Sequence, residues 1–166
     1  MRSIKHIALS AILTLSAFCA VLYTSCSKDA CKGVTCQHSG TCSGGTCTCP
    51  TGYEGTRCGT LALIGSWSGQ DACSSGGPYN IILTVASSSS DSTKILITNP
   101  GGYGASVQIT GTLSTDGKTV TYTNQTAGAV TLTGTISLTS NTAFTHSYTS
   151  TDATSTTTCS GNYTKQ

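Results

Sequence analysis

Apolar and polar residues alternate with a period of two along most of the chain after residue 60. In the clearest case, residues 129–139, apolar side chains at every second position alternate with threonine and serine. This alternation predicts β-strands that are buried on one face. Eight such segments follow one another, and no apolar periodicity typical of helices interrupts them. The predicted strands cover residues 65–72, 79–86, 94–98, 105–114, 118–123, 129–139, 142–150 and 157–164.

Short turn signals separate the predicted strands. Asn99-Pro100-Gly101-Gly102 follows the third strand. Asp116-Gly117, between the fourth and fifth strands, favours a type I′ hairpin turn, in which both central residues take positive φ. Short connections favour an antiparallel meander, which closes into a barrel or folds as a compact sandwich and so removes exposed edges. We therefore predict an all-β domain over residues 60–166, built as an antiparallel meander of about eight strands.

Two cysteines and a tryptophan indicate how the meander would close. Cys73 follows the first strand and Cys159 lies in the last, so closure would bring them together, and we expect a Cys73–Cys159 disulfide. The segment Ile64–Gly69 contains Trp67 and resembles the Gly-x-Trp signature of lipocalin-like barrels. We expect Trp67 to plug the barrel floor. Eight strands enclose enough room for side chains or for one small ligand, which leaves open whether the barrel is hollow.

The first residues have the pattern of a secretory signal. Arg2 and Lys5 precede an apolar run over residues 7–22. This run is shorter than the about 20 residues of a membrane-spanning helix, and it suits the apolar region of a signal peptide.

A predicted lipid attachment site follows the apolar run. Thr24-Ser25-Cys26 resembles the cleavage site of bacterial lipoproteins, with Tyr23 in place of the usual leucine, as in the relaxed sites of the Bacteroidota. The resemblance implies a lipoprotein signal peptide over residues 1–25, a lipid on Cys26 and a short lipid-anchored tether over residues 26–30. The alternative is an ordinary signal or an uncleaved anchor that leaves Cys26 free.

Six cysteines lie close together between the tether and the β domain, at positions 31, 36, 42, 47, 49 and 58. Their spacing, with Gly52-Tyr53 and Gly55 between the last two, resembles an EGF-like module over residues 31–59. The resemblance implies the disulfides Cys31–Cys42, Cys36–Cys47 and Cys49–Cys58. So few residues cannot bury enough apolar surface to fold unaided, and three disulfides would stabilise the module by restricting the unfolded chain.

The cysteine count agrees with an oxidised, secreted protein. Of ten cysteines, cleavage removes Cys19 and lipidation uses Cys26, which leaves an even number for disulfides. A zinc site is the alternative for the Cys47-x-Cys49 pair, but zinc ligands are usually spaced two to four residues apart. The segment before Cys31 has one carboxylate, too few oxygen ligands for calcium. We expect no metal and no cofactor.

No catalytic constellation is evident in the sequence. His146 shares a predicted strand face with Phe144 and Tyr148, which favours a buried structural role with a hydroxyl group as its hydrogen-bond partner. An enzymatic alternative would need His146 in an open pocket within reach of a serine and an aspartate. No Gly-x-Ser-x-Gly motif marks an activated serine. We therefore predict that the protein is not an enzyme.

A few residues of the β domain are candidates for binding or modification. Glycan binding along a threonine-rich sheet usually needs exposed aromatic rings, and Tyr103 and Tyr122 are the obvious candidates. Asp91-Ser92-Thr93 resembles an acceptor motif of a bacterial O-glycosylation system and would expose Ser92 in a serine-rich loop.

These patterns together resemble a lipoprotein type of the Bacteroidota and favour a non-catalytic, lipid-anchored protein of the outer membrane or cell surface. Its first predicted function is binding or adhesion, with the EGF-like module as a membrane-proximal foot. The alternative is a lipocalin-like binder that holds a small molecule inside the barrel. The expected partners are the membrane, through the lipid, and a protein, a glycan or a small apolar ligand. Nucleic acid is not expected, because six basic and six acidic residues follow residue 25.

Overall fold

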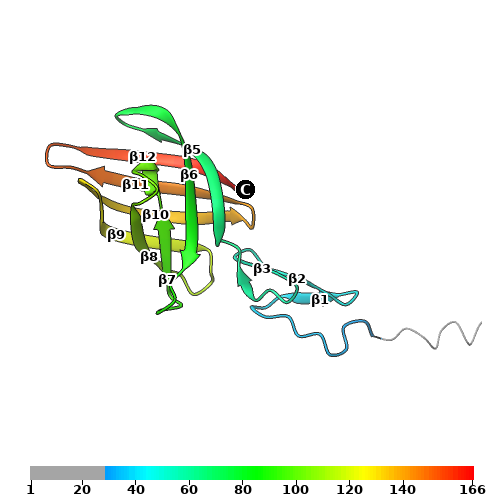
Figure 1. The fold of residues 1–166 in the computed structure, drawn as a ribbon. Helices are drawn as coiled ribbons and strands as arrows, with labels where there is room; N and C mark the ends of the chain where they lie inside the picture. Colours follow the sequence, from blue (N-terminus) through cyan, green and yellow to red (C-terminus); the bar gives the residue numbers. More distant parts are fainter. Residues whose placement is uncertain (1–28) are drawn as a thin grey trace, which may run out of the picture.

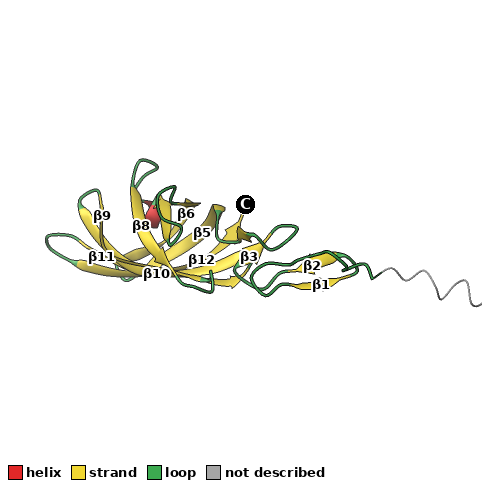
Figure 2. Cartoon of the chain, turned by 90° about the horizontal axis from the view of Figure 1, so that it is seen from below, coloured by secondary structure: helices red, strands yellow, loops and turns green. Residues whose placement is uncertain are grey.

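The computed structural model describes residues 29–166. The predicted signal peptide, Cys26 and most of the predicted tether lie outside the described residues. The described chain consists of a cysteine-rich module, residues 29–59, followed by a β-barrel (Figures 1 and 2). Between residues 29 and 166, no helix is long and apolar enough to cross a membrane.

Three disulfides hold the cysteine-rich module together. They join the same cysteines that the sequence resemblance implies, namely Cys31 to Cys42, Cys36 to Cys47 and Cys49 to Cys58. Strand β1 (Thr41–Ser43) pairs with β2 (Thr46–Thr48), and β3 (Tyr53–Glu54) pairs with β4 (Thr60–Leu61). These two short pairs are too small to bury a core, which is why the disulfides matter.

Eight antiparallel strands close into a barrel. Each strand pairs with its neighbours along the chain, and β12 pairs with β5 along what we call the seam. The barrel confirms the predicted eight-strand meander and decides against the sandwich. The elements are β5 (Gly65–Cys73), β6 (Gly76–Ser87), β7 (Lys94–Thr98), the 3₁₀ helix η1 (Pro100–Gly102), β8 (Gln108–Leu113), β9 (Thr119–Ala127), β10 (Val130–Ser140), β11 (Ala143–Thr151) and β12 (Thr156–Lys165).

The two ends of the barrel differ. We call the end where β5 begins and β12 ends the base, and it lies next to the cysteine-rich module (Figure 1). We call the opposite end the mouth, where the β5–β6 and β11–β12 hairpins turn and where η1 follows β7. The disulfide between Cys73 and Cys159 joins the mouth ends of β5 and β12 across the seam.

The turn between β8 and β9 differs from the prediction. A type I′ turn needs positive φ at both central residues, but of Asp116 and Gly117 only Gly117 has it, at 72°. The connection runs over residues 114–118 instead of two residues. The Gly117 N–H donates to the Ser114 carbonyl, and the Asp116 carboxylate accepts from the Ser114 hydroxyl at 2.6 Å. The side chain of Asp116 thus stabilises a longer turn than the dipeptide alone predicts.

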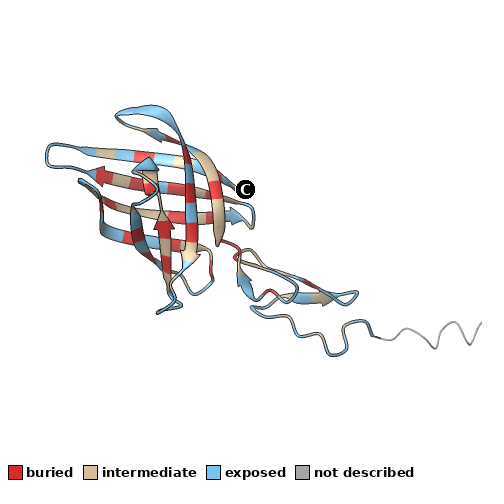
Figure 3. Ribbon diagram, in the orientation of Figure 1, coloured by how far each residue is buried: buried red, intermediate tan, exposed pale blue. Residues whose placement is uncertain are grey.

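Buried and exposed residues alternate along the barrel strands, as Figure 3 shows. Near the base, the ring of Phe144 lies between Trp67 and Tyr163, with centroid distances of 4.6 Å and 4.9 Å. Trp67 is fully buried and donates from Nε1 to the Leu63 carbonyl at 2.9 Å. Side chains therefore fill the barrel at this end, and Trp67 plugs the floor as expected.

Hydrogen bonds and an ion pair fasten the cysteine-rich module to the base. The side-chain amide of Asn141, in the β10–β11 turn, accepts from the Gly52 N–H at 2.9 Å and donates to the Tyr53 carbonyl at 2.8 Å. Lys165, at the end of β12, pairs with Glu54 at 2.7 Å. The partly exposed ion pair adds little stability by itself, so the Asn141 contacts are the more specific link between the two parts.

Candidate functional site

A pocket of about 350 Å³ opens at the mouth of the barrel, and we call it the mouth pocket. Small-molecule sites have volumes of roughly 300–1,000 Å³, so this pocket has room for a small ligand. It gathers three tyrosine rings, one carboxylate and the seam disulfide. Its lining residues are Cys73, Ser75, Tyr79, Gly101, Gly102, Tyr103, Val130, Tyr148, Ser150, Asp152, Thr157 and Cys159.

Two of the tyrosines are on the rim. The alternation of β6 predicts Tyr79 on the buried face with Ile81, but Tyr79 is 49% exposed, whereas Ile81 is buried. The reason is its position at the mouth end of β6, where the barrel opens and the inward face meets the pocket. Tyr103, 38% exposed, comes from the β7–β8 loop and donates from its hydroxyl to Ser150 at 2.6 Å.

The β7–β8 loop covers part of the mouth. Asn99 takes a left-handed conformation, with φ of 58°. Its side-chain amide donates to the Ile82 carbonyl at 2.7 Å and accepts from the Gly104 N–H at 2.8 Å. These bonds fix η1 over the barrel, where Gly101 lies so close to Tyr148 that a Cβ at position 101 would come within 2.7 Å of its hydroxyl oxygen. The loop can approach this closely because residue 101 is glycine.

Tyr148 connects the mouth pocket to a buried carboxyl group. Its hydroxyl donates to Asp71 at 2.9 Å, and the hydroxyl of Tyr163 donates to the other carboxyl oxygen at 2.8 Å. Asp71 is fully buried. Burial raises the pKa of its carboxyl, and the hydrogen bonds from the two phenols offset this rise in part. A buried polar group of this kind stays in the core only when it has such partners.

His146 is a second buried polar side chain inside the barrel. It is fully buried and shares a hydrogen bond of 2.6 Å between its Nε2 and the hydroxyl of Tyr122. Burial lowers the pKa of His146 to about 3, so the imidazole is neutral at physiological pH. Its Nδ1 is a buried nitrogen without a hydrogen-bond partner among residues 29–166. The expected hydroxyl partner is thus a tyrosine, and the open pocket with serine that the enzymatic alternative requires is not formed around His146.

Two buried residues inside the barrel, Tyr122 and Asp71, differ from what the sequence predicts. Tyr122, predicted as an exposed candidate for glycan binding, is only 2% exposed. Its position in β9 places it inward, where its hydroxyl pairs with His146. Asp71 carries no predicted role, yet it is the centre of the buried network. The signal was present in the alternation, because residue 71 is an even number of residues from Trp67 and so shares its inward face.

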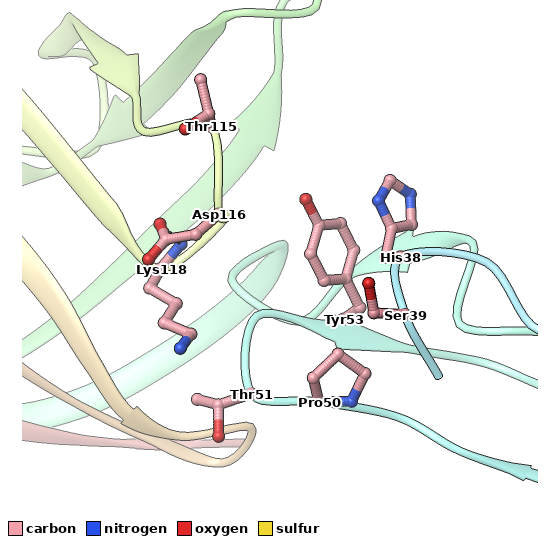
Figure 4. Close-up of a pocket in the computed structure, with 8 residues that line it drawn as sticks. All are labelled: His38, Ser39, Pro50, Thr51, Tyr53, Thr115, Asp116 and Lys118. Atoms are coloured by element: carbon pink, nitrogen blue, oxygen red, sulfur yellow. Dashed lines mark hydrogen bonds between the residues drawn. The ribbon is translucent and has the colours of Figure 1, made fainter. Parts of the chain in front are cut away.

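A second pocket, of about 340 Å³, lies between the cysteine-rich module and the barrel base, and we call it the interface pocket (Figure 4). On the module side, the rings of His38 and Tyr53 stack with centroids 3.7 Å apart. Asp116 and Lys118 come from the β8–β9 turn on the opposite side. His38 is exposed, as expected. Because Tyr53 packs between His38 and the backbone of Gly117, its ring serves the junction between the two parts.

The remaining predicted site residues have mixed outcomes. All eight cysteines from Cys31 to Cys159 are paired in the structure, whereas Cys26 lies outside the described residues. Ser92 is exposed in the β6–β7 loop. No group of three histidine, cysteine, aspartate or glutamate side chains suited to a metal ion occurs in the described part of the chain.

No protein-family model matches the chain, and no curated protein matches its sequence. Among solved structures, it is similar to EF1p2_mFAP2b bound to DFHBI, with a TM-score of 0.49 and 15% identity, covering 63% of this chain and 94% of that one. It is also similar to the redesigned β-barrel mFAP1 bound to DFHBI, with a TM-score of 0.46 and 19% identity over 63% and 95% of the two chains. The redesigned barrel b11L5F_LGL gives 0.45 and 17% over 63% and 92%. A likeness at this level does not extend to function.

Proposed function

We propose that the barrel binds a small molecule in the mouth pocket. The observation that carries the proposal is the convergence of Tyr79, Tyr103 and Tyr148 on one pocket of about 350 Å³. The exposed rings of Tyr79 and Tyr103 beside a concave site would give a ligand apolar contact area, and Tyr148 lies below them as a buried wall of the pocket.

The proposed ligand lies at the mouth and not in the depth of the barrel. Toward the base, the interior is filled by the packed rings of Trp67, Phe144 and Tyr163. The depth that remains ends at Tyr148, whose hydroxyl is bonded to Asp71. This refines the small-molecule alternative from the sequence, and it is better supported than adhesion because the pocket gathers specific side chains on the described surface.

Lipid anchoring through Cys26 is the second part of the proposal, and it is supported by the sequence of residues 1–26. Only four residues separate Cys26 from Cys31, a span of roughly 15 Å when extended. The cysteine-rich module would therefore lie against the membrane surface. Because the module contacts the barrel base, the mouth pocket would face away from the membrane.

Binding at the mouth can be tested without knowing the natural ligand. We would screen a library of small aromatic and polar fragments by NMR against the full-length protein with its disulfides formed. The expected result is a set of fragments that shift the resonances of Tyr79, Tyr103 and Tyr148. Native mass spectrometry of protein purified from its source would show whether a ligand accompanies it.

A matched pair of variants on β6 tests the location. Tyr79→Ser should weaken binding of these fragments, whereas Ile82→Ser should not, because Ile82 is 60% exposed but does not line the pocket. Both changes remove a large exposed side chain from the same strand. If no fragment binds at the mouth, or if Tyr79→Ser and Ile82→Ser have the same effect, the proposed site is wrong.

A further inference from the structure

The basic side chains of the barrel are all at its base. Residues 60–166 contain three lysines and no arginine. Lys94 begins β7, Lys118 precedes β9 and Lys165 ends β12, so all three are at the base. Asp91 and Asp116 are also at the base, in the connections before β7 and β9, whereas Asp71 and Asp152 are toward the mouth, where Asp152 lines the pocket. Within residues 29–166, no basic side chain lines the mouth pocket.

The carboxylate of Asp152 is held in place at the pocket by the β11–β12 hairpin. It accepts from the backbone N–H groups of Thr154 and Ser155, both at 2.7 Å, and from the Thr154 hydroxyl at 2.8 Å. Hydrogen bonds from Thr154, and then from Ser155, lower the pKa of Asp152 to about 2. The carboxylate therefore carries its charge at every physiological pH.

The tyrosine rings add to this negative end. The face of an aromatic ring carries partial negative charge and attracts an ammonium group placed over it. Three rings, from Tyr79, Tyr103 and Tyr148, line the pocket together with Asp152. Tyr79 and Tyr103 are exposed, whereas Tyr148 is buried and stacks on His146. The hydroxyls of Tyr103 and Tyr148 are already bonded to Ser150 and Asp71, so the ring surfaces of Tyr79 and Tyr103 are what a ligand can reach.

We propose that the mouth pocket selects small organic cations, such as primary or quaternary ammonium compounds, over neutral molecules of the same shape. The proposal rests on the proposed function and specifies its ligand class. Aromatic rings attract the cation, the Asp152 carboxylate neutralises it, and the lysines are too far away, at the base, to repel it. A neutral molecule of equal size would gain only the apolar contacts.

The direct test compares choline with 3,3-dimethylbutan-1-ol, which replaces the quaternary nitrogen by carbon and keeps the shape. Both would be titrated into the full-length protein by NMR, with the tyrosine resonances of the mouth as the readout. We expect choline to bind about tenfold more tightly, since cation–π attraction to several rings adds to the carboxylate.

Two aspartate variants distinguish an effect of the charge at the mouth pocket from an effect of the net charge of the protein. Asp152→Asn should weaken choline binding about fivefold, in line with the loss of one nearby charge in a well-solvated site, and should leave the alcohol unchanged. Asparagine can still accept the backbone N–H bonds of the turn. Asp116→Asn is the matched control, because Asp116 also closes an exposed turn but lies at the base, and it should change neither affinity.

The possible outcomes distinguish the two proposals. If the alcohol binds as tightly as choline, or if Asp152→Asn and Asp116→Asn have equal effects, the cation proposal is overturned while binding at the mouth stands. If neither compound binds at millimolar concentrations, the cation proposal also fails, and the fragment screen decides independently whether the mouth binds anything.

Discussion

Gly161 and Asp71 are directly opposite each other across the seam, and the carboxylate of Asp71 occupies the space that a side chain at position 161 would need. The buried hydrogen bonds of Asp71 therefore require a residue without a side chain at position 161. This relationship gives the most direct test of the packing inside the barrel.

Gly161→Ala should destabilise the barrel strongly. Its Cβ would collide with Oδ1 of Asp71 and with the Gln70 backbone, and overpacking of this kind typically costs about 1–3 kcal/mol or more. Urea denaturation followed by tyrosine fluorescence would measure the loss. Ser160→Ala, at the exposed neighbouring position, should stay within about 0.5 kcal/mol of the wild type. Equal stability of the two variants would contradict the described packing.

Asp71→Ala should reduce the free energy of unfolding by about 3 kcal/mol, because it leaves the buried hydroxyls of Tyr148 and Tyr163 without their acceptor. Asp71→Asn should cost less, since the amide oxygen can still accept one of these bonds. Denaturant unfolding of both variants checks the order. A stable Asp71→Ala protein would mean that the carboxyl does not hold the network together.

Stability should depend on pH through His146. Its pKa is about 3 in the folded barrel and about 6.5 in an unfolded chain. Between these values, the unfolded chain binds a proton that the folded barrel excludes, so stability should fall as the pH decreases from about 6.5. The slope contributed by one such group is at most about 1.4 kcal/mol per pH unit.

The variant His146→Gln isolates the contribution of His146 to the pH dependence of stability. Asp71 has the opposite effect on stability, because its raised pKa makes the folded state keep a proton that the unfolded chain has lost. The stability that Asp71 contributes at low pH is therefore lost as the pH rises through its pKa in the folded state. Unfolding curves of wild type and His146→Gln between pH 4.5 and 6.5 cancel this shared term. The wild type should lose stability relative to the variant on acidification, and parallel curves would show that His146 does not titrate as described.

Replacing both seam cysteines should weaken the barrel substantially. The Cys73–Cys159 bond closes a loop with a sequence separation of 86, and constraining so long a loop stabilises a protein by about 3–5 kcal/mol in the usual model. The double variant Cys73→Ala, Cys159→Ala avoids a free thiol, and thermal unfolding would show the loss. Peptide mapping of the oxidised wild type should join the two cysteines to each other. A bond from either one to the cysteine-rich module would refute the described closure.

Cys26→Ser should abolish membrane anchoring if the lipid is attached there. One acyl chain binds membranes only weakly, so firm anchoring needs several chains on this residue. The wild type should partition into the detergent phase and Cys26→Ser into the aqueous phase. Cys19→Ser serves as the control and should behave like the wild type. Unchanged partitioning of Cys26→Ser, or a mature N-terminus elsewhere, would exclude this site.

The strands could be predicted from the sequence because alternation is a local property, and each strand of the barrel repeats it. Alternation also places Asp71 on the inward face, but a carboxyl group is almost never fully buried unless it is paired, and the sequence does not show its partners. The partners of Asp71 are 77 and 92 residues away along the chain. The exposure of Tyr79 could not be predicted from the sequence either. Alternation gives its inward direction, but only the closed barrel shows that position 79 is at the open end.

The mouth pocket and the interface pocket could not be predicted from the sequence. Each brings together side chains from strands and loops whose relative placement depends on the order of the strands around the barrel and on turn geometry. The longer turn at Asp116 is an example: it is closed by a hydrogen bond from the Ser114 hydroxyl, and its residues Thr115, Asp116 and Lys118 line the interface pocket.

The seam disulfide also determines how the molecule would respond to proteolysis and to mechanical force. A single proteolytic cut in any loop between Cys73 and Cys159 leaves one covalent molecule, because the bond still joins the two ends. Tension between the cysteine-rich module and the C-terminus passes through residues 60–73, the disulfide and residues 159–166. The chain between the two cysteines carries none of it. A barrel exposed to proteases and to shear would thus keep its first and last strands joined after damage that separates them in an uncrosslinked barrel.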